Sequence, residues 1–230
     1  MPKSRFTSSR PGVLTALALV ALGFASLSID LPVARWFEAG QAKVADKLLQ
    51  LSEVFGHGLG AVAILLTVAV LDPARRWALP RLVLASLGAG LVANGGKLLV
   101  ARLRPHHAEL ARGAGETFLG WLPLGGGRSY EQGCPSAHTA TAVGLAIGLA
   151  WLYPRGRWWF ATLAGLVALQ RVEAGAHFLS DAVWGSALGV AIGAAAVQLP
   201  SLGYLGNKLE AWARQSGVSD CSPREQRLTP

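Results

Sequence analysis

Six apolar runs, separated by shorter polar segments, constrain the fold of this chain more than any other feature. They lie at residues 13–29, 57–71, 79–101, 138–153, 158–174 and 181–199. Crossing a hydrocarbon core about 30 Å thick takes about 20 mostly apolar residues in a helix. The chain is also 52% hydrophobic and only 15% charged, with a mean hydropathy of +0.39, which is unusual for a soluble domain of this length. We therefore predict an all-α, polytopic membrane protein built as a six-helix transmembrane bundle, in which the second and fourth spans are short.

The basic residues of the short connections predict the orientation of the bundle, because cytoplasmic loops are enriched in Lys and Arg. Four clusters flank the runs: Lys3, Arg5 and Arg10, then Arg75 and Arg76, then Arg155 and Arg157, and finally Lys208, Arg214, Arg224 and Arg227. In a six-span layout all four lie on one side, which we predict to be cytoplasmic together with both termini. We expect a bacterial inner (cytoplasmic) membrane, with residues 30–56, 104–137 and 173–180 on the periplasmic side.

Four arginines on the predicted outer side oppose this bias, which ligand binding by some of them would explain. They are Arg102, Arg104, Arg112 and Arg128. We expect one membrane domain at residues 1–203 and a cytoplasmic C-terminal tail at residues 204–230. The glycine-rich segment 106–133 is too polar to span a membrane and is expected to cover or flank an outward-facing site.

Apolar residues recur at spacings near three and four between the first two runs, which predicts a periplasmic amphipathic helix at the membrane interface. These positions are Trp36, Val44, Leu48, Leu51 and Phe55. Two roles for this helix remain open, a cap over the bundle and a lip through which lipid reaches the site.

Several other interpretations fit the composition less well. The net charge of +8 is compatible with nucleic-acid binding, but the basic residues gather beside the spans and form no single stripe, so no such partner is expected. The basic start followed by apolar residues 13–25 also fits a secretory signal peptide, but its removal would leave an odd number of spans. Cys134 and Cys221 fall on opposite sides in this topology, so no disulfide is expected.

Three polar islands at the ends of apolar runs are the candidate functional residues, because charges at such positions are costly and tend to be functional. In the first island, Lys97 and Arg104 are seven residues apart. This spacing predicts that both lie on one helix face, about 10 Å apart along the axis, before Pro105 ends the helix. Simple snorkelling of both cations to the headgroup layer is the alternative, and Asn94 one turn earlier weakens it.

The second island is Ser136 with His138, directly ahead of the fourth run. A helix N-terminus presents free backbone N–H groups and a positive dipole end, so it binds phosphate readily. Ser136 would add a hydroxyl and His138 a proton donor. The alternative is an ordinary N-cap serine followed by an interface histidine.

The third island is Arg171, His177 and Asp181. A spacing of four lets the Asp181 carboxylate reach the His177 imidazole if the segment is helical, which would leave the other ring nitrogen free as a base or nucleophile. Arg171 lies about two turns earlier and can grip a phosphate with a bidentate fork. A purely structural His–Asp pair is the alternative.

Taken together, the islands resemble the three-part signature of the phosphatidic acid phosphatase type 2 superfamily, which includes membrane lipid phosphatases and vanadium-dependent haloperoxidases. The matching motifs, in order, are Lys97-x6-Arg104-Pro105, Pro135-Ser136-Ala137-His138 and Arg171-x5-His177-x3-Asp181. Two positions depart from the usual pattern, because Ala137 replaces a glycine and Gln170 replaces a serine. Ala137 can still offer its backbone N–H, whereas Gln170 bears on how Arg171 is held.

The resemblance implies a lipid phosphatase in which His177 attacks phosphorus and forms a phosphohistidine, while Asp181 orients it. His138 would protonate the leaving oxygen and then activate water. Five groups, together called the cage, would hold the phosphoryl oxygens: Lys97, Arg104, Arg171, Ser136 and the backbone of Ala137. The scheme needs no metal or other cofactor, and its partners are the bilayer and a phosphorylated membrane lipid. Polyprenyl diphosphate, phosphatidic acid, phosphatidylglycerol phosphate and lipid A would all suit such a site.

Other functions use overlapping residues. A lipid phosphotransferase would use the same site, and haloperoxidase chemistry would need vanadate in the same cage. A metal hydrolase lacks a compact ligand motif and leaves three cations unexplained; its ligands would be His106, His107, His138, His177 and Asp181. An anion transporter or non-catalytic anion-binding protein is the alternative from a different class, but transporters usually place charge near the midplane and show repeated halves.

Overall fold

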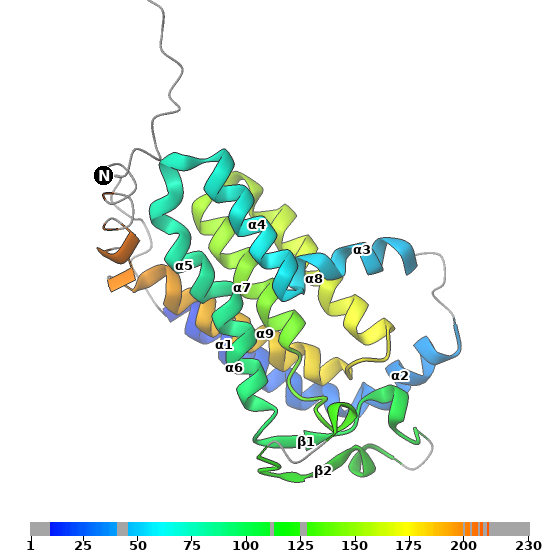
Figure 1. Cartoon of the computed structure of the whole chain (residues 1–230). Coiled ribbons are helices and arrows are strands. Elements are labelled where there is room, and N and C mark those ends of the chain that lie inside the picture. The colour runs from blue at the N-terminus through cyan, green and yellow to red at the C-terminus, as the bar shows by residue number, and fades with distance from the viewer. Residues whose placement is uncertain are drawn as a thin grey trace, which may run out of the picture.

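The computed structural model describes residues 10–40, 46–110, 113–124, 128–199, 201–202, 204–206, 208 and 211 (Figure 1). The longer elements are α1 (Arg10–Ser26), α2 (Asp30–Glu38), α3 (Asp46–Gly56), α4 (Gly58–Leu71), α5 (Leu79–Val83), α6 (Ala89–Gly96), β1 (Val100–Arg102), β2 (Phe118–Trp121), α7 (Ala137–Leu152), α8 (Arg157–Glu173) and α9 (Leu179–Gln198). Short 3-10 turns lie between several of them, and a π-helical turn at Leu84–Gly88 joins α5 to α6.

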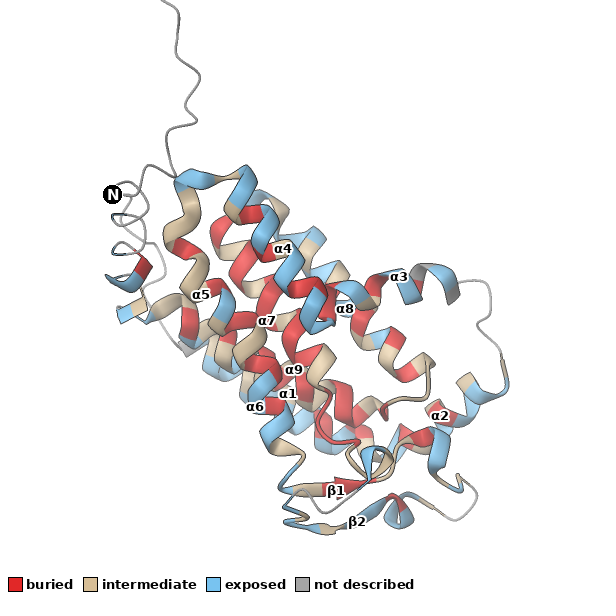
Figure 2. Ribbon diagram, in the orientation of Figure 1, coloured by how far each residue is buried: buried red, intermediate tan, exposed pale blue. Residues whose placement is uncertain are grey.

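Helix α7 is the centre of the bundle and packs against α9, α8, α6 and α3. Figure 2 shows buried residues running along α7 and α9, with exposed residues toward the outer helices. Small residues make this packing close, because Ala89 and Ala93 of α6 meet Ala140 of α7 in one buried cluster. Close backbone approach through small residues is the usual way in which helices associate in a membrane.

The outward faces of the bundle are apolar, as expected for contact with lipid. In α1, Leu14 is 66% exposed and Phe24 is 63% exposed. Within the described residues, three helical segments are long and apolar enough to cross a membrane, namely Pro11–Glu38, Pro73–Gly96 and Leu179–Gln198. A fourth is obtained if Leu49–Gly56 and Gly58–Leu71, bent by 71°, count as one span. A helix occupies each of the six apolar runs, but the six-span layout itself stays a prediction.

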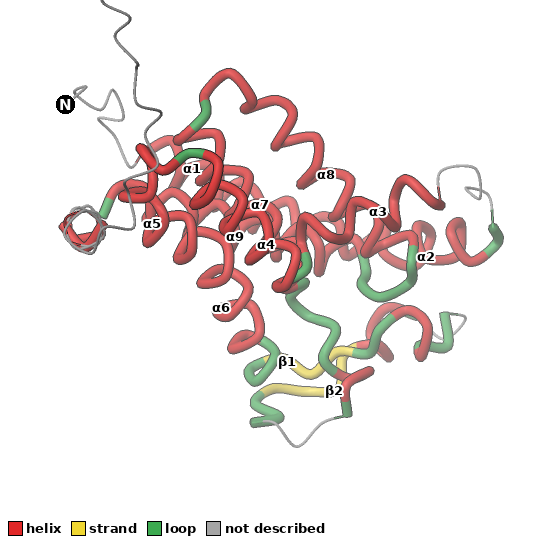
Figure 3. The backbone as a smooth tube through the Cα atoms, turned by 45° about the horizontal axis from the view of Figure 1, so that its top comes forward, coloured by secondary structure: helices red, strands yellow, loops and turns green. Residues whose placement is uncertain are grey.

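The end of the third run was predicted wrongly. The helix ends at Gly96 with Lys97 as its C-cap. Leu98 and Leu99 form a turn, and β1 follows and pairs antiparallel with β2. Figure 3 shows this small sheet at one end of the helical bundle. The glycine-rich segment 106–133 therefore contributes a strand and short 3-10 turns, so the fold is mainly helical, as predicted, with a small two-stranded sheet that the prediction did not include.

The predicted interface helix divides into two helices. Helix α2 continues from α1, so the first helical segment runs on to Glu38, and α3 is separate. Leu49, Ser52 and Phe55 form the buried face of α3, whereas Leu51 is 70% exposed. Leu51 is therefore not part of the face that packs on the bundle, and Val44 lies outside the described residues.

The two ends of the bundle differ in chemistry. The α4–α5 and α7–α8 connections meet at one end, where the Tyr153 hydroxyl is 3.1 Å from Asp72 Oδ2 and the Arg75 guanidinium lies 4.7 Å from the centre of the Tyr153 ring. Two of the four basic clusters thus share that end, and the sheet lies at the other (Figure 1). The predicted tail lies almost entirely outside the described residues, as do Lys3, Arg5 and Cys221.

Candidate active site

The three polar islands meet at the sheet end of the bundle. Lys97 follows α6, Arg104 follows β1, and His138 is the second residue of α7. Arg171 lies in the last turn of α8, and His177 lies in the connection between α8 and α9. Elements far apart in the sequence thus bring every predicted cationic group to one place.

Lys97 and Arg104 are close in space, although not as two turns of one helix. The Arg104 backbone N–H donates to the Tyr130 carbonyl at 2.9 Å, which fixes the chain beyond β1. Burial lowers the pKa of Lys97, and the positive charge of Arg104 lowers it further. Pro105 begins a 3-10 turn and does not end a long helix. The prediction that both residues belong to one helix face was therefore wrong, but their proximity is real.

His177 is buried, and its surroundings fix its protonation. Its Nδ1 lies 2.6 Å from the Gly133 carbonyl oxygen; since a carbonyl only accepts, Nδ1 carries the hydrogen. Burial, together with the positive charges of Lys97, Arg104 and Arg171, lowers the pKa of His177 to about 3, against the effect of this hydrogen bond. His177 is therefore neutral near pH 7, and its Nε2 carries a free lone pair.

Gly133 can take this position because it has no side chain. A Cβ at residue 133 would lie 2.9 Å from the Arg102 carbonyl oxygen and 3.1 Å from that of Leu103. The Gly133 backbone N–H donates a hydrogen bond of 2.9 Å to the Arg102 carbonyl, which holds the two backbones together at this point. The strand β1 therefore holds the carbonyl that orients His177.

Asp181 does not make the contact that its spacing suggested. Its Oδ1 accepts from Arg102 at 2.7 Å, and its Oδ2 accepts from the Phe178 backbone N–H at 2.9 Å, at the start of α9. The segment at His177 is not helical, so the interval of four residues does not bring the carboxylate to the imidazole. The expected hydrogen bond between Asp181 and His177 is replaced by the one from His177 to Gly133.

Arg102 is the centre of a buried polar network beneath the site. It is 4% exposed, pairs with Asp30 at 2.7 Å and donates to Ser180 Oγ at 2.7 Å. The Ser180 N–H and hydroxyl both bond to the Asp30 carboxylate. Arg102 was a candidate for ligand binding among the outer arginines; instead it joins α2, β1 and α9. No sequence pattern indicates a role for Asp30 or Ser180 beyond their polarity.

The N-terminus of α7 carries the second motif. Ser136 is the N-cap, and its fully buried hydroxyl accepts from the Thr139 N–H at 3.4 Å and lies 3.0 Å from Thr139 Oγ1. The N-cap interpretation of Ser136 is therefore confirmed. Ala137 follows as the first helical residue, where a backbone N–H has no partner within its own helix.

Two of the cage arginines have donors that remain unused. Arg104 Nε and Arg171 Nε are buried and have no hydrogen-bond partner within the part of the chain that the structure describes. Buried donors are nearly always paired in proteins, so unpaired ones among cations indicate a site for an anion. Gln170, which departs from the family pattern beside Arg171, is 3% exposed, and its Oε1 also has no partner among the described residues.

Glu53 is an acidic residue at this site that the sequence did not suggest. Its Oε1 lies 2.9 Å from the Arg171 guanidinium and 3.6 Å from His138 Nε2. In the sequence, Glu53 is one of several charged residues within an amphipathic segment. Such residues usually lie on the solvated face of a helix, so nothing in the pattern indicated a role at the site.

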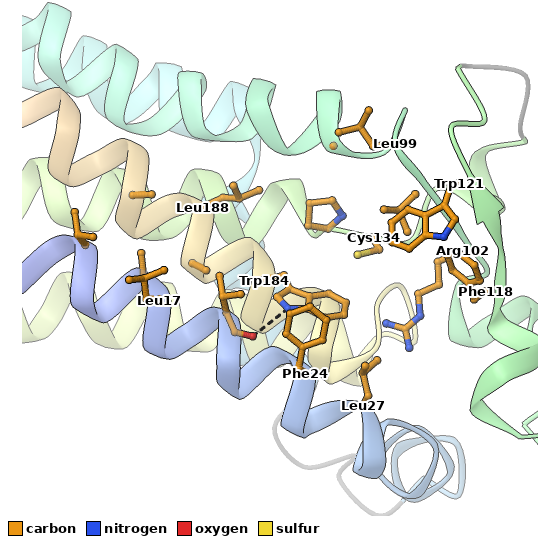
Figure 4. A pocket seen from close by; sticks show the side chains of 18 of the residues that line it. Leu17, Phe24, Leu27, Leu99, Arg102, Phe118, Trp121, Cys134, Trp184 and Leu188 are labelled. Atoms are coloured by element: carbon orange, nitrogen blue, oxygen red, sulfur yellow. Dashed lines mark hydrogen bonds between the residues drawn. The ribbon is translucent and has the colours of Figure 1, made fainter.

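An apolar groove of about 1050 Å³ borders the site (Figure 4). Its lining includes Gly96, which directly precedes Lys97 in the sequence, and Cys134 and Pro135, which lead into Ser136. Burial raises the pKa of the Cys134 thiol. The larger side chains around the groove come from α1, α9 and the sheet: Leu17, Phe24, Trp184, Leu188, Phe118 and Trp121.

The residues named for the metal-hydrolase alternative are dispersed. His106 donates its backbone N–H to Gly175, His107 packs on the ring of Tyr130, and the Asp181 carboxylate is held by Arg102. Among the residues that the structure describes, no group of three or more His, Cys, Asp or Glu side chains is arranged to hold a metal ion.

Comparisons with known proteins agree with the motifs. A family model described as the PAP2 superfamily matches residues 78–202. Two curated relatives are proteins named Lipid A 1-phosphatase, one from Rhizobium etli and one from Rhizobium johnstonii. Each is 33% identical over 101 residues, which cover 44% of this chain and 41% and 39% of the two relatives. The matched region thus spans less than half of either relative, and no solved structure matches the chain.

Proposed function

The chain belongs to the PAP2 superfamily, and from that premise we propose that it is an integral-membrane lipid phosphatase acting through a phosphohistidine. The observation that carries the proposal is the buried, neutral imidazole of His177 beneath three cations. Both relatives are named Lipid A 1-phosphatase, so lipid A is the first substrate to test. Polyprenyl diphosphate, phosphatidic acid and phosphatidylglycerol phosphate are the other candidates.

In the proposed reaction, His177 Nε2 attacks phosphorus while the bond between phosphorus and the lipid oxygen breaks. The leaving oxygen takes a proton from His138, so the lipid departs as an alcohol or, from a diphosphate, as a lipid monophosphate. His138 must therefore enter the reaction as the imidazolium, which the Glu53 carboxylate favours. Water then attacks the phosphohistidine, with His138 accepting its proton, and inorganic phosphate leaves with His177 restored. A positioned general acid of this kind typically contributes a factor of about 10² to 10⁴ in rate.

Lys97, Arg104 and Arg171 would hold the phosphoryl oxygens and stabilise the charge that spreads over them in the transition state. The unpaired Nε atoms of both arginines support this role. The backbone N–H of Ala137 and the positive end of α7 would add to the cage. Ser136 would contribute through the free hydrogen of its hydroxyl.

Asp181 has a different role from the one that the motif spacing suggested. We assign the orientation of His177 to the Gly133 carbonyl. Asp181 instead holds Arg102 and caps α9 at Phe178, which fixes the connection that carries His177. Its contribution to activity would therefore be through position, without contact to the imidazole.

A lipid substrate is favoured over a soluble phosphate ester by the apolar surroundings of the cage. The groove beside residues 134–135 has an almost wholly apolar lining, and the outward faces of the helices are apolar. We propose that one domain, residues 1–203, spans a bacterial inner membrane six times, with the site on the periplasmic side and both termini, including the tail 204–230, in the cytoplasm. The bilayer and the phosphorylated lipid are then its partners.

The test is phosphate release by detergent-purified protein from the four candidate lipids in EDTA, with His177→Ala as the control. We expect release from at least one lipid without added metal, and loss of at least a thousandfold in the variant. Turnover that disappears in EDTA and returns with magnesium would contradict the scheme. Transfer of phosphate to a second lipid in place of water would identify a phosphotransferase.

A further inference from the structure

Helix α3 lies directly against the site, and one glycine allows it. A Cβ at Gly56 would lie 2.7 Å from the His138 carbonyl oxygen and 2.6 Å from Val167 Cγ1. The C-terminal turn of α3 therefore touches the backbone of the first turn of α7 and a side chain of α8. Because α3 packs this closely on α7, the side chain of Glu53, one turn earlier on α3, lies beside Arg171 and His138.

One oxygen of Glu53 faces two residues of the proposed machinery. Its Oε1 accepts a hydrogen bond of 2.9 Å from Arg171 and lies at ion-pair distance, 3.6 Å, from His138 Nε2. The His57 ring, just beyond the end of α3, lies 5.6 Å from the His138 ring, centre to centre. The surroundings of His138 thus include a carboxylate from α3, a guanidinium from α8 and a second imidazole.

A solvated surface ion pair would be the simplest explanation, and such pairs usually contribute little. The burial of the partner argues against it, because the Arg171 side chain is only 12% exposed, whereas Glu53 is 35% exposed. Arg171 also has a buried Nε without a partner among the described residues. The contact to Glu53 is the only side-chain hydrogen bond of Arg171 found within the described ranges, so it decides where this guanidinium lies.

We propose that Glu53 is a positioning residue of the phosphatase site, which sets the place of Arg171 and, through the same oxygen, the orientation of the His138 imidazole. The proposal rests on the proposed function. It makes α3 more than a cap, because the helix supplies a side chain that acts through two members of the machinery. A carboxylate held beside a histidine is a common way of fixing the ring that transfers a proton.

The proposal predicts a dependence on the leaving group. Proton donation by His138 matters most when the leaving oxygen is a strongly basic alkoxide, as in a lipid monophosphate, and least when it is the weakly basic phenolate of p-nitrophenyl phosphate. The loss of Glu53 should therefore slow the two substrates unequally. A change that merely loosened the fold would slow both by the same factor.

The experiment compares Glu53→Gln with wild-type protein on short-chain phosphatidic acid and on p-nitrophenyl phosphate. We expect kcat/KM, which includes departure of the leaving group but not the later attack of water, to fall at least tenfold further on the lipid than on p-nitrophenyl phosphate. KM should rise for both because Arg171 loses its negatively charged partner. In a His138→Ala background, Glu53→Gln should no longer change the ratio of the two rates. Glu116→Gln, which removes an exposed carboxylate at the same end of the molecule, should match wild type.

Equal losses on both substrates, or none, would overturn the role of Glu53 while leaving the phosphatase intact. Absence of turnover by wild-type protein on p-nitrophenyl phosphate and on all four candidate lipids would overturn the proposed function itself, and the role of Glu53 with it. If another phosphate monoester among the four lipids is turned over in place of phosphatidic acid, it takes the place of phosphatidic acid in the comparison. If Glu53→Gln does not yield folded protein, Glu53→Asp replaces it, since its carboxylate is one methylene shorter. The same unequal loss, of smaller size, is expected there.

Discussion

At the scale of single residues, His177 shows how burial and charge set the reactivity of one side chain. Protonation of a buried imidazole beside three cations is unfavourable, and the Gly133 carbonyl fixes which nitrogen carries the hydrogen. The proposed nucleophile is thus unprotonated at Nε2 at neutral pH without a neighbouring base. The same cations that keep the imidazole neutral are the ones proposed to bind phosphate, so one arrangement serves both needs.

The lowered pKa of His177 makes the stability of the protein depend on pH. The imidazole has a pKa of about 3 in the folded state and 6.5 as its ordinary value, so the unfolded chain binds the proton first. The stability that the neutral ring contributes is complete above about pH 6.5 and is lost as the pH falls toward about 3. We expect the Tm in detergent to fall less between pH 6.5 and pH 4 for His177→Gln than for wild type. Parallel curves would contradict the assignment.

The residues of the site could be predicted from the sequence more completely than their partners. Charged groups at the ends of apolar runs, in three spaced motifs, identified Lys97, Arg104 and His177 as a set. The partner of His177 is a backbone carbonyl, which leaves no mark in a sequence pattern. The spacing of Asp181 was taken as helical, but α9 begins only at Leu179, and Asp181 pairs elsewhere.

At the scale of elements, hydropathy predicted where helices lie better than where they end. The third run continues through Leu98, Leu99 and Val100, but the helix stops after the pair Gly95–Gly96, where the helix-forming tendency is low. Hydropathy alone does not decide whether a short apolar stretch is helix or strand; here Leu98 and Leu99 form a turn and β1 begins at Val100. The sheet in turn holds Gly133 in place.

Substitutions at two nearby glycines, Gly56 and Gly58, test whether the close packing of α3 on α7 matters for activity. Gly56→Ala adds a methyl group where a backbone carbonyl lies 2.7 Å away, whereas Gly58→Ala adds one where no atom lies within 4 Å. We expect Gly56→Ala to displace α3 and lower kcat/KM on lipid substrate by about tenfold, a loss typical of misplaced catalytic groups. Gly58→Ala should keep wild-type activity. Equal activity of the two variants in a phosphate-release assay would show that the contact does not matter.

At the scale of the whole molecule, buried polar contacts tie together segments that lie far apart in the chain. Arg102 joins Asp30 of α2 to Asp181 of α9. Removing one member of a buried pair leaves an uncompensated charge and typically costs about 3 to 5 kcal/mol. This network fixes the start of α9, directly after His177, the proposed nucleophile. No periodicity in the sequence indicates it, because its members come from three separate elements.

Trapping the phosphohistidine is the measurement that shows whether His177 attacks phosphorus. Protein mixed with lipid carrying a radioactive phosphate would be quenched in alkali within milliseconds, digested and examined by mass spectrometry. We predict an alkali-stable, acid-labile phosphate on His177, absent from His177→Ala. Phosphate on another residue, or turnover without any phosphohistidine and undiminished in His177→Ala, would contradict the account.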